Sequence, residues 1–294
     1  MWADVWLGWG HNKPDMKHMQ ERKSQASAII ISVSSDIGLA LAERWQNQGI
    51  KVVGTFRTPS PKLKAMKSVD AIHCDLGNKA SVQKACDDLI CSCPFWDYLI
   101  LCPGAQEPVG DFMGCDFDQW EASIEVNFSR QIQMVHRLLP YRNIKNGKLP
   151  VVLFFAGGGA NNATVNYSAY TISKIALIKM CELLDAEILD ASFAILGPGW
   201  VKTKIHNATI QAGEKAGGNY QKTIEKLASN ECTPMESVLD CCDWIVNSPR
   251  NIISGRNFSV VFDAWGTPEL TAQLAADPSM YKLRRHGNGW QVKN

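Results

Sequence analysis

The 294-residue sequence has no stretch of about eighteen apolar residues, which excludes a helix that crosses a membrane. It has no run of five like charges either, and its 30 basic and 29 acidic residues leave a formal net charge of +1. This balance argues against nucleic acid or an acidic membrane surface as a main partner. Internal repeats, low-complexity segments and linkers are also missing, so the 46% of hydrophobic residues are expected to form one large core.

The first 25 residues lack the basic start and the continuous apolar run of a signal peptide. They contain three tryptophans, Trp2, Trp6 and Trp9, and we interpret residues 1–25 as an extension outside the fold. Two interpretations of this extension stay open: a loosely ordered tail, or an arm that packs its indoles on a neighbouring subunit.

None of the ten cysteines stands in a C-x-x-C pair, although Cys91 and Cys93 are close together and Cys241 and Cys242 are adjacent. Because a secretory signal is also missing, we expect free thiols in a reducing compartment and a cytoplasmic protein. The cysteines are interpreted as small buried hydrophobic residues, and no metal site is expected.

Short apolar, β-branched runs alternate with helical patterns along the chain. The expected strands span residues 26–33, 51–56, 71–74, 96–102, 150–155, 193–196 and 257–262. Because parallel neighbours need crossover connections, strands separated by helices predict a doubly wound, Rossmann-like α/β fold: about seven parallel strands with helices on both faces. We expect one domain over residues 26–263, with a Gly-, Lys- and Asn-rich segment containing one helix at about 203–232 and a tail at 264–294.

Tyr170 and Lys174 stand four residues apart at the head of a long helical pattern. On a helix their side chains would lie one turn apart on the same face. A phenol with a pKa of about 10 exchanges protons poorly at neutral pH, and a fixed ammonium beside it lowers that pKa by favouring the phenolate. The spacing indicates an acid/base unit, although Y-x-x-x-K alone also arises by chance.

The turn after the first expected strand reads S-V-S-S-D-I-G, from Ser32 to Gly38. A dinucleotide fold needs small residues here, so that the backbone can approach a pyrophosphate at the N-terminus of the following helix. Gly38 is the one remaining glycine of a G-x-x-x-G-x-G pattern, while the serine hydroxyls can donate to phosphate. Asp36 would bring a negative charge near the phosphates unless it caps the helix and points away.

Further motifs stand at Asp75-Leu76, at Asn127, and in P-G-W-V-K-T from Pro198 to Thr203. With the serine-rich turn and Y-x-x-x-K, in this order and at these intervals, they resemble the short-chain dehydrogenase/reductase family over about residues 26–263. The segment 277–285 is similar to a bacterial subgroup of that family.

The resemblance implies a role for each matching residue. Tyr170 would donate and accept the proton of a carbonyl or alcohol, Lys174 would bind the nicotinamide ribose and depress the tyrosine pKa, and Asn127 would hold a water that extends the proton relay. Val201 and Thr203 would contact the nicotinamide carboxamide. The full set of implied nucleotide-binding residues is Ser32, Ser34, Ser35, Ile37, Gly38, Arg57, Asp75, Leu76, Gly104, Tyr170, Lys174, Val201 and Thr203.

Arg57 follows the second expected strand, where an NAD-specific protein usually offers an acidic residue to the ribose 2′-hydroxyl. A guanidinium at this place suits a 2′-phosphate, to which it makes charge-assisted contacts. We therefore expect NADP as the cofactor, with NAD as the alternative; a solvated arginine at a strand end is the other interpretation of Arg57.

Two segments depart from the family pattern. Residues 101–104 read L-C-P-G instead of N-N-A-G, so Gly104 is kept and the asparagine is lost. The catalytic serine expected about thirteen residues before Tyr170 is replaced by A-G-G at residues 156–158. Losing one such donor costs about 10²–10³ in rate. Backbone N–H groups of the glycine run, or the side chains of Asn161, Asn162 or Thr164, are candidates to replace it.

These observations predict an NADP(H)-dependent oxidoreductase that moves a hydride between nicotinamide and a small carbonyl or alcohol substrate, assembled as a homodimer or homotetramer. Substrate specificity is expected to come from the segment after Thr203, in which His206 is interpreted as a surface histidine. The rival prediction is a nucleotide-binding sensor or assembly protein of the same fold with little or no catalysis, and it is supported by the missing serine.

Overall fold

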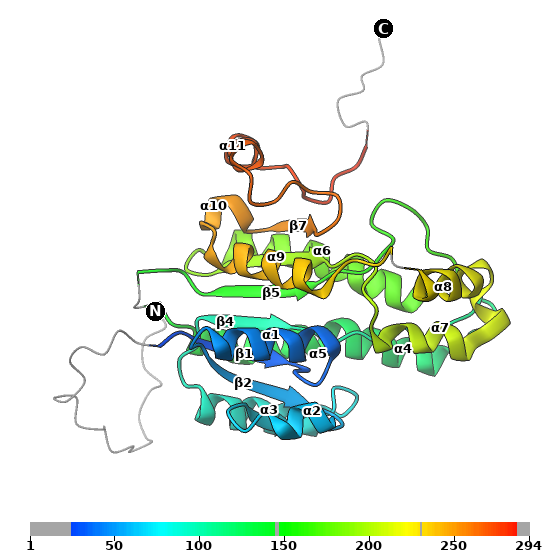
Figure 1. Ribbon diagram of the computed structural model, residues 1–294, viewed down its shortest axis with the longest axis horizontal. Helices are drawn as coiled ribbons and strands as arrows, with labels where there is room; N and C mark the ends of the chain where they lie inside the picture. Colours follow the sequence, from blue (N-terminus) through cyan, green and yellow to red (C-terminus); the bar gives the residue numbers. More distant parts are fainter. Residues whose placement is uncertain (1–24, 145–146, 230, 287–294) are drawn as a thin grey trace, which may run out of the picture.

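The structure is a computed structural model that describes residues 25–144, 147–229 and 231–286 (Figure 1). The predicted N-terminal extension with Trp2, Trp6 and Trp9 lies outside the described residues, apart from Gln25, and so do the last residues of the predicted tail.

A single sheet of seven parallel strands forms the centre of the fold, in the order β3-β2-β1-β4-β5-β6-β7. The strands are β1 (Ser27–Ile31), β2 (Lys51–Phe56), β3 (Asp70–His73), β4 (Tyr98–Leu101), β5 (Val151–Phe155), β6 (Ser192–Gly197) and β7 (Arg256–Ser259). This confirms the predicted doubly wound fold. The strand order reverses between β1 and β4, and in open sheets of this kind ligands bind beyond the carboxyl ends of the strands at such a point.

Helices cover both faces of the sheet. They are α1 (Asp36–Asn47), α2 (Pro61–Ala65), α3 (Lys79–Ser92), α4 (Phe117–Ile124), α5 (Arg130–Leu138), α6 (Ser168–Glu187), α7 (Asn207–Ala212), α8 (Gly218–Ala228), α9 (Met235–Asn247), α10 (Arg250–Ile253) and α11 (Pro268–Ala276). One core joins the sheet to α1, α9, α10 and α11, and the other joins it to α3, α5 and α6. Strand β1 is fully buried because Ala28 and Ile30 face the first core while Ile29 and Ile31 face the second.

The long helix predicted for residues 117–139 is interrupted. A π-helical turn from Glu125 to Ser129 separates α4 from α5, and Asn127 lies within it, fully buried. Single π-turns inside α-helices are frequent at functional sites. The turn therefore places an irregularity where the sequence predicts a site residue.

The segment 203–232 contains more structure than the single helix expected from its composition. It forms α7, α8 and two 3-10 turns, Lys204–His206 and Gly213–Ala216, which lie beyond the carboxyl ends of the strands (Figure 1). Glycines with positive φ end α7 at Gly213 and precede α8 at Gly217. These breaks keep both helices short, at 6 residues in α7 and 11 residues in α8.

The predicted tail contains α11 in its described part. Thr267 caps this helix, since its side chain accepts a hydrogen bond from the N–H of Leu270 at 3.2 Å, and Pro268 occupies the first helical position. Leu270 and Leu274 are buried against the core, and the guanidinium of Arg256 in β7 donates to the Leu274 carbonyl. Residues 268–276 therefore pack on the domain.

Within the described ranges, no helix is long and apolar enough to cross a membrane. The ten cysteines are all free, and six of them, Cys74, Cys86, Cys93, Cys181, Cys241 and Cys242, are buried. Burial raises the pKa of these thiols above its ordinary value, which keeps them protonated and poorly reactive.

Candidate active site

The turn between β1 and α1 lies at the point where the strand order reverses. Ser32 begins it in the left-handed region, at φ 60, and Ser35 caps α1 by accepting a hydrogen bond from the N–H of Gly38. A Cβ on Gly38 would lie 2.7 Å from the carbonyl oxygen of Ser32, so only glycine fits this turn. Free amide groups at the start of the 12-residue helix α1 are suited to a phosphate.

Asp36 does not cap α1, and it does not point toward open solvent either. One of its carboxylate oxygens accepts a hydrogen bond from the backbone N–H of Lys204 at 2.7 Å. The ammonium of Lys204 lies 3.6 Å from the other oxygen. The negative charge expected near the phosphates therefore has a positive partner from the segment after Thr203.

Arg57 and Asp75 follow two neighbouring strands, β2 and β3, whose last residues pair in register. Arg57 is exposed and, among the described residues, has no hydrogen bond or ion pair. The Asp75 carboxylate accepts from the N–H of Gly77 at 2.9 Å, and Leu76 is buried beside it. The guanidinium is thus free to bind an anion beyond the carboxyl end of β2.

Tyr170 and Lys174 lie on the first turns of α6, as predicted. Lys174 is only 2% exposed, and its ammonium donates hydrogen bonds to the carbonyls of Pro103, at 2.9 Å, and Phe155, at 3.1 Å. The ammonium lies 5.7 Å from the centre of the Tyr170 ring. The two side chains therefore share one face of the helix, next to the carboxyl ends of β4 and β5.

The pKa values of this pair differ from the sequence expectation. Burial raises the pKa of Tyr170 to about 12 and lowers that of Lys174 to about 8, because both charged forms lose solvation. The expected lowering of the tyrosine pKa by the lysine is not found, because burial of the phenol determines the direction of the shift. Tyr170 is a protonated phenol at neutral pH, which is the form that donates a proton.

Asn127 is tied to the chain that follows β4. Its side-chain oxygen accepts from the N–H of Ala105 at 2.9 Å, and its side-chain nitrogen donates to the Ala105 carbonyl and to the Ser123 hydroxyl. Gly104, one residue earlier, lies beside the Lys174 ammonium, since a Cβ at this glycine would be 4.0 Å from it. Asn127 and Lys174 thus hold adjacent parts of one loop.

The position of the missing serine faces the tyrosine. A Cβ on Gly157 would lie 2.9 Å from the Tyr170 hydroxyl oxygen and 2.8 Å from a ring carbon. Of the three proposed substitutes, Asn161 and Asn162 are exposed, whereas Thr164 contacts the glycine run: its hydroxyl oxygen would be 3.2 Å from a Cβ on Gly159. Thr164 is the one of the three whose side chain lies next to this backbone.

His206 is buried, at 8% exposure, and the interpretation of this residue as a surface histidine is wrong. Its ring stacks on Trp200 with centroids 3.8 Å apart, and Nε2 donates to the Val201 carbonyl at 2.8 Å. Burial lowers its pKa, so the ring is neutral at neutral pH. The same Val201 carbonyl receives the Thr203 hydroxyl at 3.4 Å, which fixes the loop predicted to contact a carboxamide.

A second group of side chains was not predicted from the sequence. The Tyr167 hydroxyl lies 2.7 Å from the Thr209 hydroxyl, which in turn donates to the side-chain oxygen of Gln106 at 3.2 Å. This chain of contacts joins the start of α6, helix α7 and the loop after β4. No local motif signals it, because the three residues meet only through the tertiary fold.

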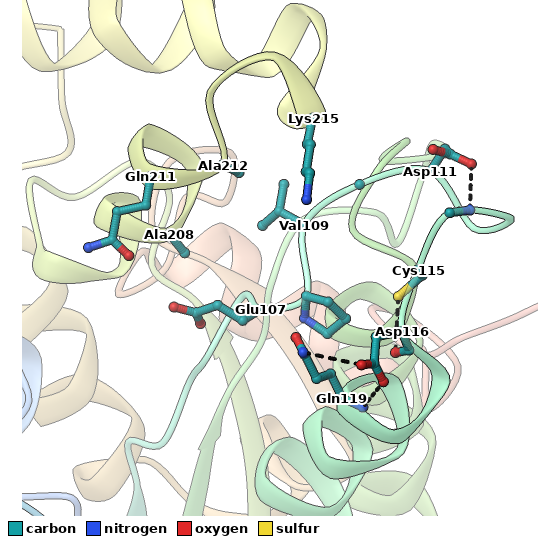
Figure 2. Close-up of a pocket in the computed structure, with 13 residues that line it drawn as sticks. Glu107, Val109, Asp111, Cys115, Asp116, Gln119, Ala208, Gln211, Ala212 and Lys215 are labelled. Carbon is teal, nitrogen blue, oxygen red and sulfur yellow. Dashed lines mark hydrogen bonds between the residues drawn. The ribbon is translucent and has the colours of Figure 1, made fainter.

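A pocket of about 430 Å³ opens next to this group, between residues 107–116 and the α7 region (Figure 2). Its wall carries Glu107 and Lys215, which make no hydrogen bond or ion pair within the described part of the chain. Asp111 and Asp116 also line it, but each accepts a hydrogen bond from a nearby backbone N–H, that of Gly114 and that of Gln119. Neither Tyr170 nor Lys174 lines the pocket, which is therefore separate from the acid/base pair.

A parallel sheet with a phosphate-compatible turn at its switch point, and a tyrosine and lysine on the helix after β5, define a dinucleotide-binding α/β protein of the dehydrogenase class. Residues 26–214 match the model of the family described as short chain dehydrogenase, and the chain belongs to this family of oxidoreductases.

Three known proteins illustrate the similarity of this chain to dehydrogenases and reductases. The human "Dehydrogenase/reductase SDR family member 2, mitochondrial" is 24% identical over 247 residues, which cover 79% of this chain and 84% of the relative. The crystal structure of actinorhodin polyketide ketoreductase with NADPH has a TM-score of 0.71 at 15% identity, and covers 81% of this chain and 97% of its own. A 3-ketoacyl-(acyl-carrier-protein) reductase from Brucella melitensis complexed with NADH has a TM-score of 0.68 at 18% identity, with 80% and 96% covered. At these identities the likeness to the solved structures concerns the fold.

Proposed function

We propose that the protein is an NADP(H)-dependent oxidoreductase that transfers a hydride between nicotinamide and the carbonyl or alcohol group of a small molecule. The observation that carries the proposal is that the Tyr170 hydroxyl lies where a Cβ on Gly157 would come within 2.9 Å of it, one helical turn from the buried ammonium of Lys174. A phenol facing an open backbone position can meet a substrate oxygen. A buried ammonium beside it stabilises negative charge.

The chain's own groups account for the proton. A bound NADPH would supply the hydride for the new C–H bond at the carbonyl carbon and would leave as NADP⁺. Tyr170 gives its phenolic proton to the carbonyl oxygen, and Lys174, supported by Asn127 through the loop after β4, stabilises the resulting phenolate. In alcohol oxidation each transfer runs in reverse, with the phenolate of Tyr170 as the base.

The residues around the switch point support a dinucleotide with a 2′-phosphate. Arg57 offers a free guanidinium after β2, and the start of α1 offers amide groups. Ser34, Val201 and Thr203 stand where the diphosphate and carboxamide contacts are proposed. The two solved relatives named above hold NADPH in one case and NADH in the other, so the preference for NADP rests on Arg57.

We further propose that Thr164 takes over the role of the missing serine, with the amides of the glycine run as its support. Its hydroxyl approaches Gly158 and Gly159, directly beside the Gly157 position. Thr164→Val keeps the shape of the side chain and removes the donor. The expected result is a kcat lower by about 10²-fold with little change in NADPH affinity, and Asn161→Ala, exposed on the same loop, is the control.

We propose one dinucleotide-binding domain over residues 26–263, in which residues 203–232 contact the substrate and residues 264–294 add α11. A homodimer or homotetramer is typical of the family. A cytoplasmic location suits the ten free thiols, although the human relative is named mitochondrial.

The rival function is a nucleotide sensor with little catalysis, and the glycine at position 157 favours it. The deciding experiment titrates NADPH and NADH by fluorescence, and then compares wild type, Tyr170→Phe and Tyr141→Phe on a panel of carbonyls and alcohols. We expect binding of NADPH, and turnover that Tyr170→Phe lowers by about 10²–10⁴-fold while Tyr141→Phe leaves it unchanged. Tight binding without turnover on any compound supports the sensor, and absence of binding contradicts both functions.

A further inference from the structure

The buried ring of His206 folds back on the start of the loop that follows β6. It stacks on Trp200 with ring centroids 3.8 Å apart and planes 5° from parallel. Its Nε2 lies 2.8 Å from the main-chain oxygen of Val201, five residues earlier in the chain. Because a carbonyl oxygen only accepts, Nε2 must carry the hydrogen of the neutral ring. His206 therefore presents one N–H donor to the loop.

The backbone on either side of His206 is held by contacts outside this loop. Before it, the N–H of Lys204 donates to the carboxylate of Asp36 in α1 at 2.7 Å. After it, the hydroxyl of Thr209 in α7 lies 2.7 Å from that of Tyr167 at the start of α6. The position of the His206 donor is thus fixed by α1 and α6, and does not depend on the residues that it contacts.

The Val201 carbonyl receives two donors of unequal quality. Val201 is only 5% exposed, and a buried carbonyl needs a hydrogen-bond partner. The bond from His206 has an ordinary length of 2.8 Å. The Thr203 hydroxyl lies at 3.4 Å, beyond the range of about 2.5–3.0 Å for a well-formed O–H···O bond. His206 is therefore the main partner of this carbonyl, and the single hydroxyl hydrogen of Thr203 is only weakly engaged.

Thr203 is one of the two residues for which a contact with the nicotinamide carboxamide is proposed. Without the N–H of His206, the Thr203 hydroxyl would be the one donor that the described residues offer to the Val201 carbonyl. We propose that His206 is a positioning residue of the nicotinamide site: by satisfying the Val201 carbonyl, it leaves the Thr203 hydroxyl hydrogen available to the carboxamide. This inference rests on the proposed function, and it adds a residue that touches neither the nucleotide nor the substrate.

Two substitutions separate this role from packing. His206→Phe keeps a ring that can stack on Trp200 and removes the N–H donor. His206→Gln gives up the stacked ring and keeps a side-chain N–H. A positioning role predicts that Phe weakens nucleotide binding more than Gln, whereas a packing role predicts the reverse, because Gln loses the aromatic contact. His136→Phe is the matched control, since His136 is exposed on α5.

The measurement is calorimetric titration with two ligands, NADPH and 2′-phospho-ADP-ribose. The second ligand has the adenine, the 2′-phosphate and the diphosphate of NADPH but no nicotinamide. His206→Phe should weaken NADPH by about three- to tenfold, the effect of one hydrogen bond, and leave the affinity for 2′-phospho-ADP-ribose unchanged. His206→Gln and His136→Phe should bind both ligands about as well as the wild type.

A double-variant cycle tests whether the effect passes through Thr203. Thr203→Val removes the hydroxyl and should itself weaken NADPH by about three- to tenfold. If His206 acts by keeping that hydroxyl available, His206→Phe/Thr203→Val should bind NADPH no more weakly than Thr203→Val alone. Independent effects would instead multiply, to a loss of about 10–100-fold.

Three results overturn the role of His206 and leave the proposed function standing: equal losses for the two ligands in His206→Phe, a larger loss of NADPH affinity in His206→Gln than in His206→Phe, or losses that multiply in the cycle. A wild type that binds neither ligand contradicts the proposed function and the role of His206 together. Thermal unfolding without nucleotide shows whether each variant is folded. If His206→Phe is not, His206→Leu, which also lacks a donor, takes its place with the same expected results.

Discussion

The carboxylate of Asp36, in the first turn of α1, accepts a hydrogen bond from the backbone N–H of Lys204, 168 residues later in the chain, at 2.7 Å. The Lys204 ammonium lies 3.6 Å from the same carboxylate and 3.5 Å from the Ser34 carbonyl. The turn proposed for the diphosphate and the segment that follows Thr203 are therefore tied together. An acidic residue beside a diphosphate is acceptable here because a lysine compensates its charge.

Removing that compensation should weaken nucleotide binding. In Lys204→Met the backbone N–H remains, but Asp36 is left as an unpaired negative charge near the diphosphate. We expect NADPH affinity to fall about two- to fivefold, the range of an exposed ion pair, and to fall more at low salt. Fluorescence titration at two ionic strengths measures it, with the exposed Lys202→Met as control.

The double variant with Asp36→Asn separates compensation from direct phosphate binding. Asparagine keeps an oxygen for the Lys204 N–H and loses the charge, so Asp36→Asn/Lys204→Met should recover wild-type affinity. If the double variant binds as weakly as Lys204→Met, the lysine acts on the nucleotide itself.

Restoring a side chain at position 157 should disturb Tyr170. A Cβ there meets the tyrosine ring and hydroxyl at 2.8 to 3.0 Å, so the ring must move. Gly157→Ala is expected to lower kcat at least tenfold and to lower the free energy of unfolding by about 1–3 kcal/mol. Gly158→Ala is the matched control, because its Cβ would be an ordinary 3.8 Å from Thr164. Chemical denaturation and steady-state kinetics of both variants check this, and equal behaviour of the two contradicts it.

The two reaction directions should differ in their pH dependence. Carbonyl reduction needs the protonated phenol of Tyr170, which persists because burial raises its pKa to about 12, and the charged form of Lys174, whose pKa burial lowers to about 8. The rate of reduction should therefore be flat from pH 6 to 7 and fall as pH rises through about 8. Alcohol oxidation needs the phenolate, which is scarce at neutral pH, so its rate should rise with pH until Lys174 loses its proton. Profiles of kcat/KM between pH 6 and 10 in both directions test this, and a reduction rate that climbs above pH 8 is incompatible with it.

The sequence predicts the centre of the sheet well because β1, β4, β5 and β6 are apolar runs buried on both faces, a local signal that needs no partner to be recognised. It predicts Tyr170 and Lys174 on one helix face for a similar reason, since their spacing alone determines the face. The pKa values were predicted with the wrong sign for tyrosine, because desolvation depends on everything packed around the phenol and outweighs one nearby ammonium. The burial of His206 also arises from tertiary packing, and a polar residue carries no local sign that it will be buried.

Arg57 should decide between the two nicotinamide nucleotides. It is exposed after β2 and has no hydrogen bond or ion pair with the described residues, so Arg57→Ala should leave the free energy of unfolding unchanged. A charge-assisted hydrogen bond to a 2′-phosphate contributes about 1.5–3 kcal/mol, so the variant should bind NADPH about 10–100-fold more weakly and NADH with unchanged affinity. Lys64→Ala, exposed on α2, controls for a general loss of positive charge at this edge. Parallel titrations of both nucleotides give the ratio of affinities, and a ratio that Arg57→Ala does not change would mean that this arginine is a solvated residue at a strand end.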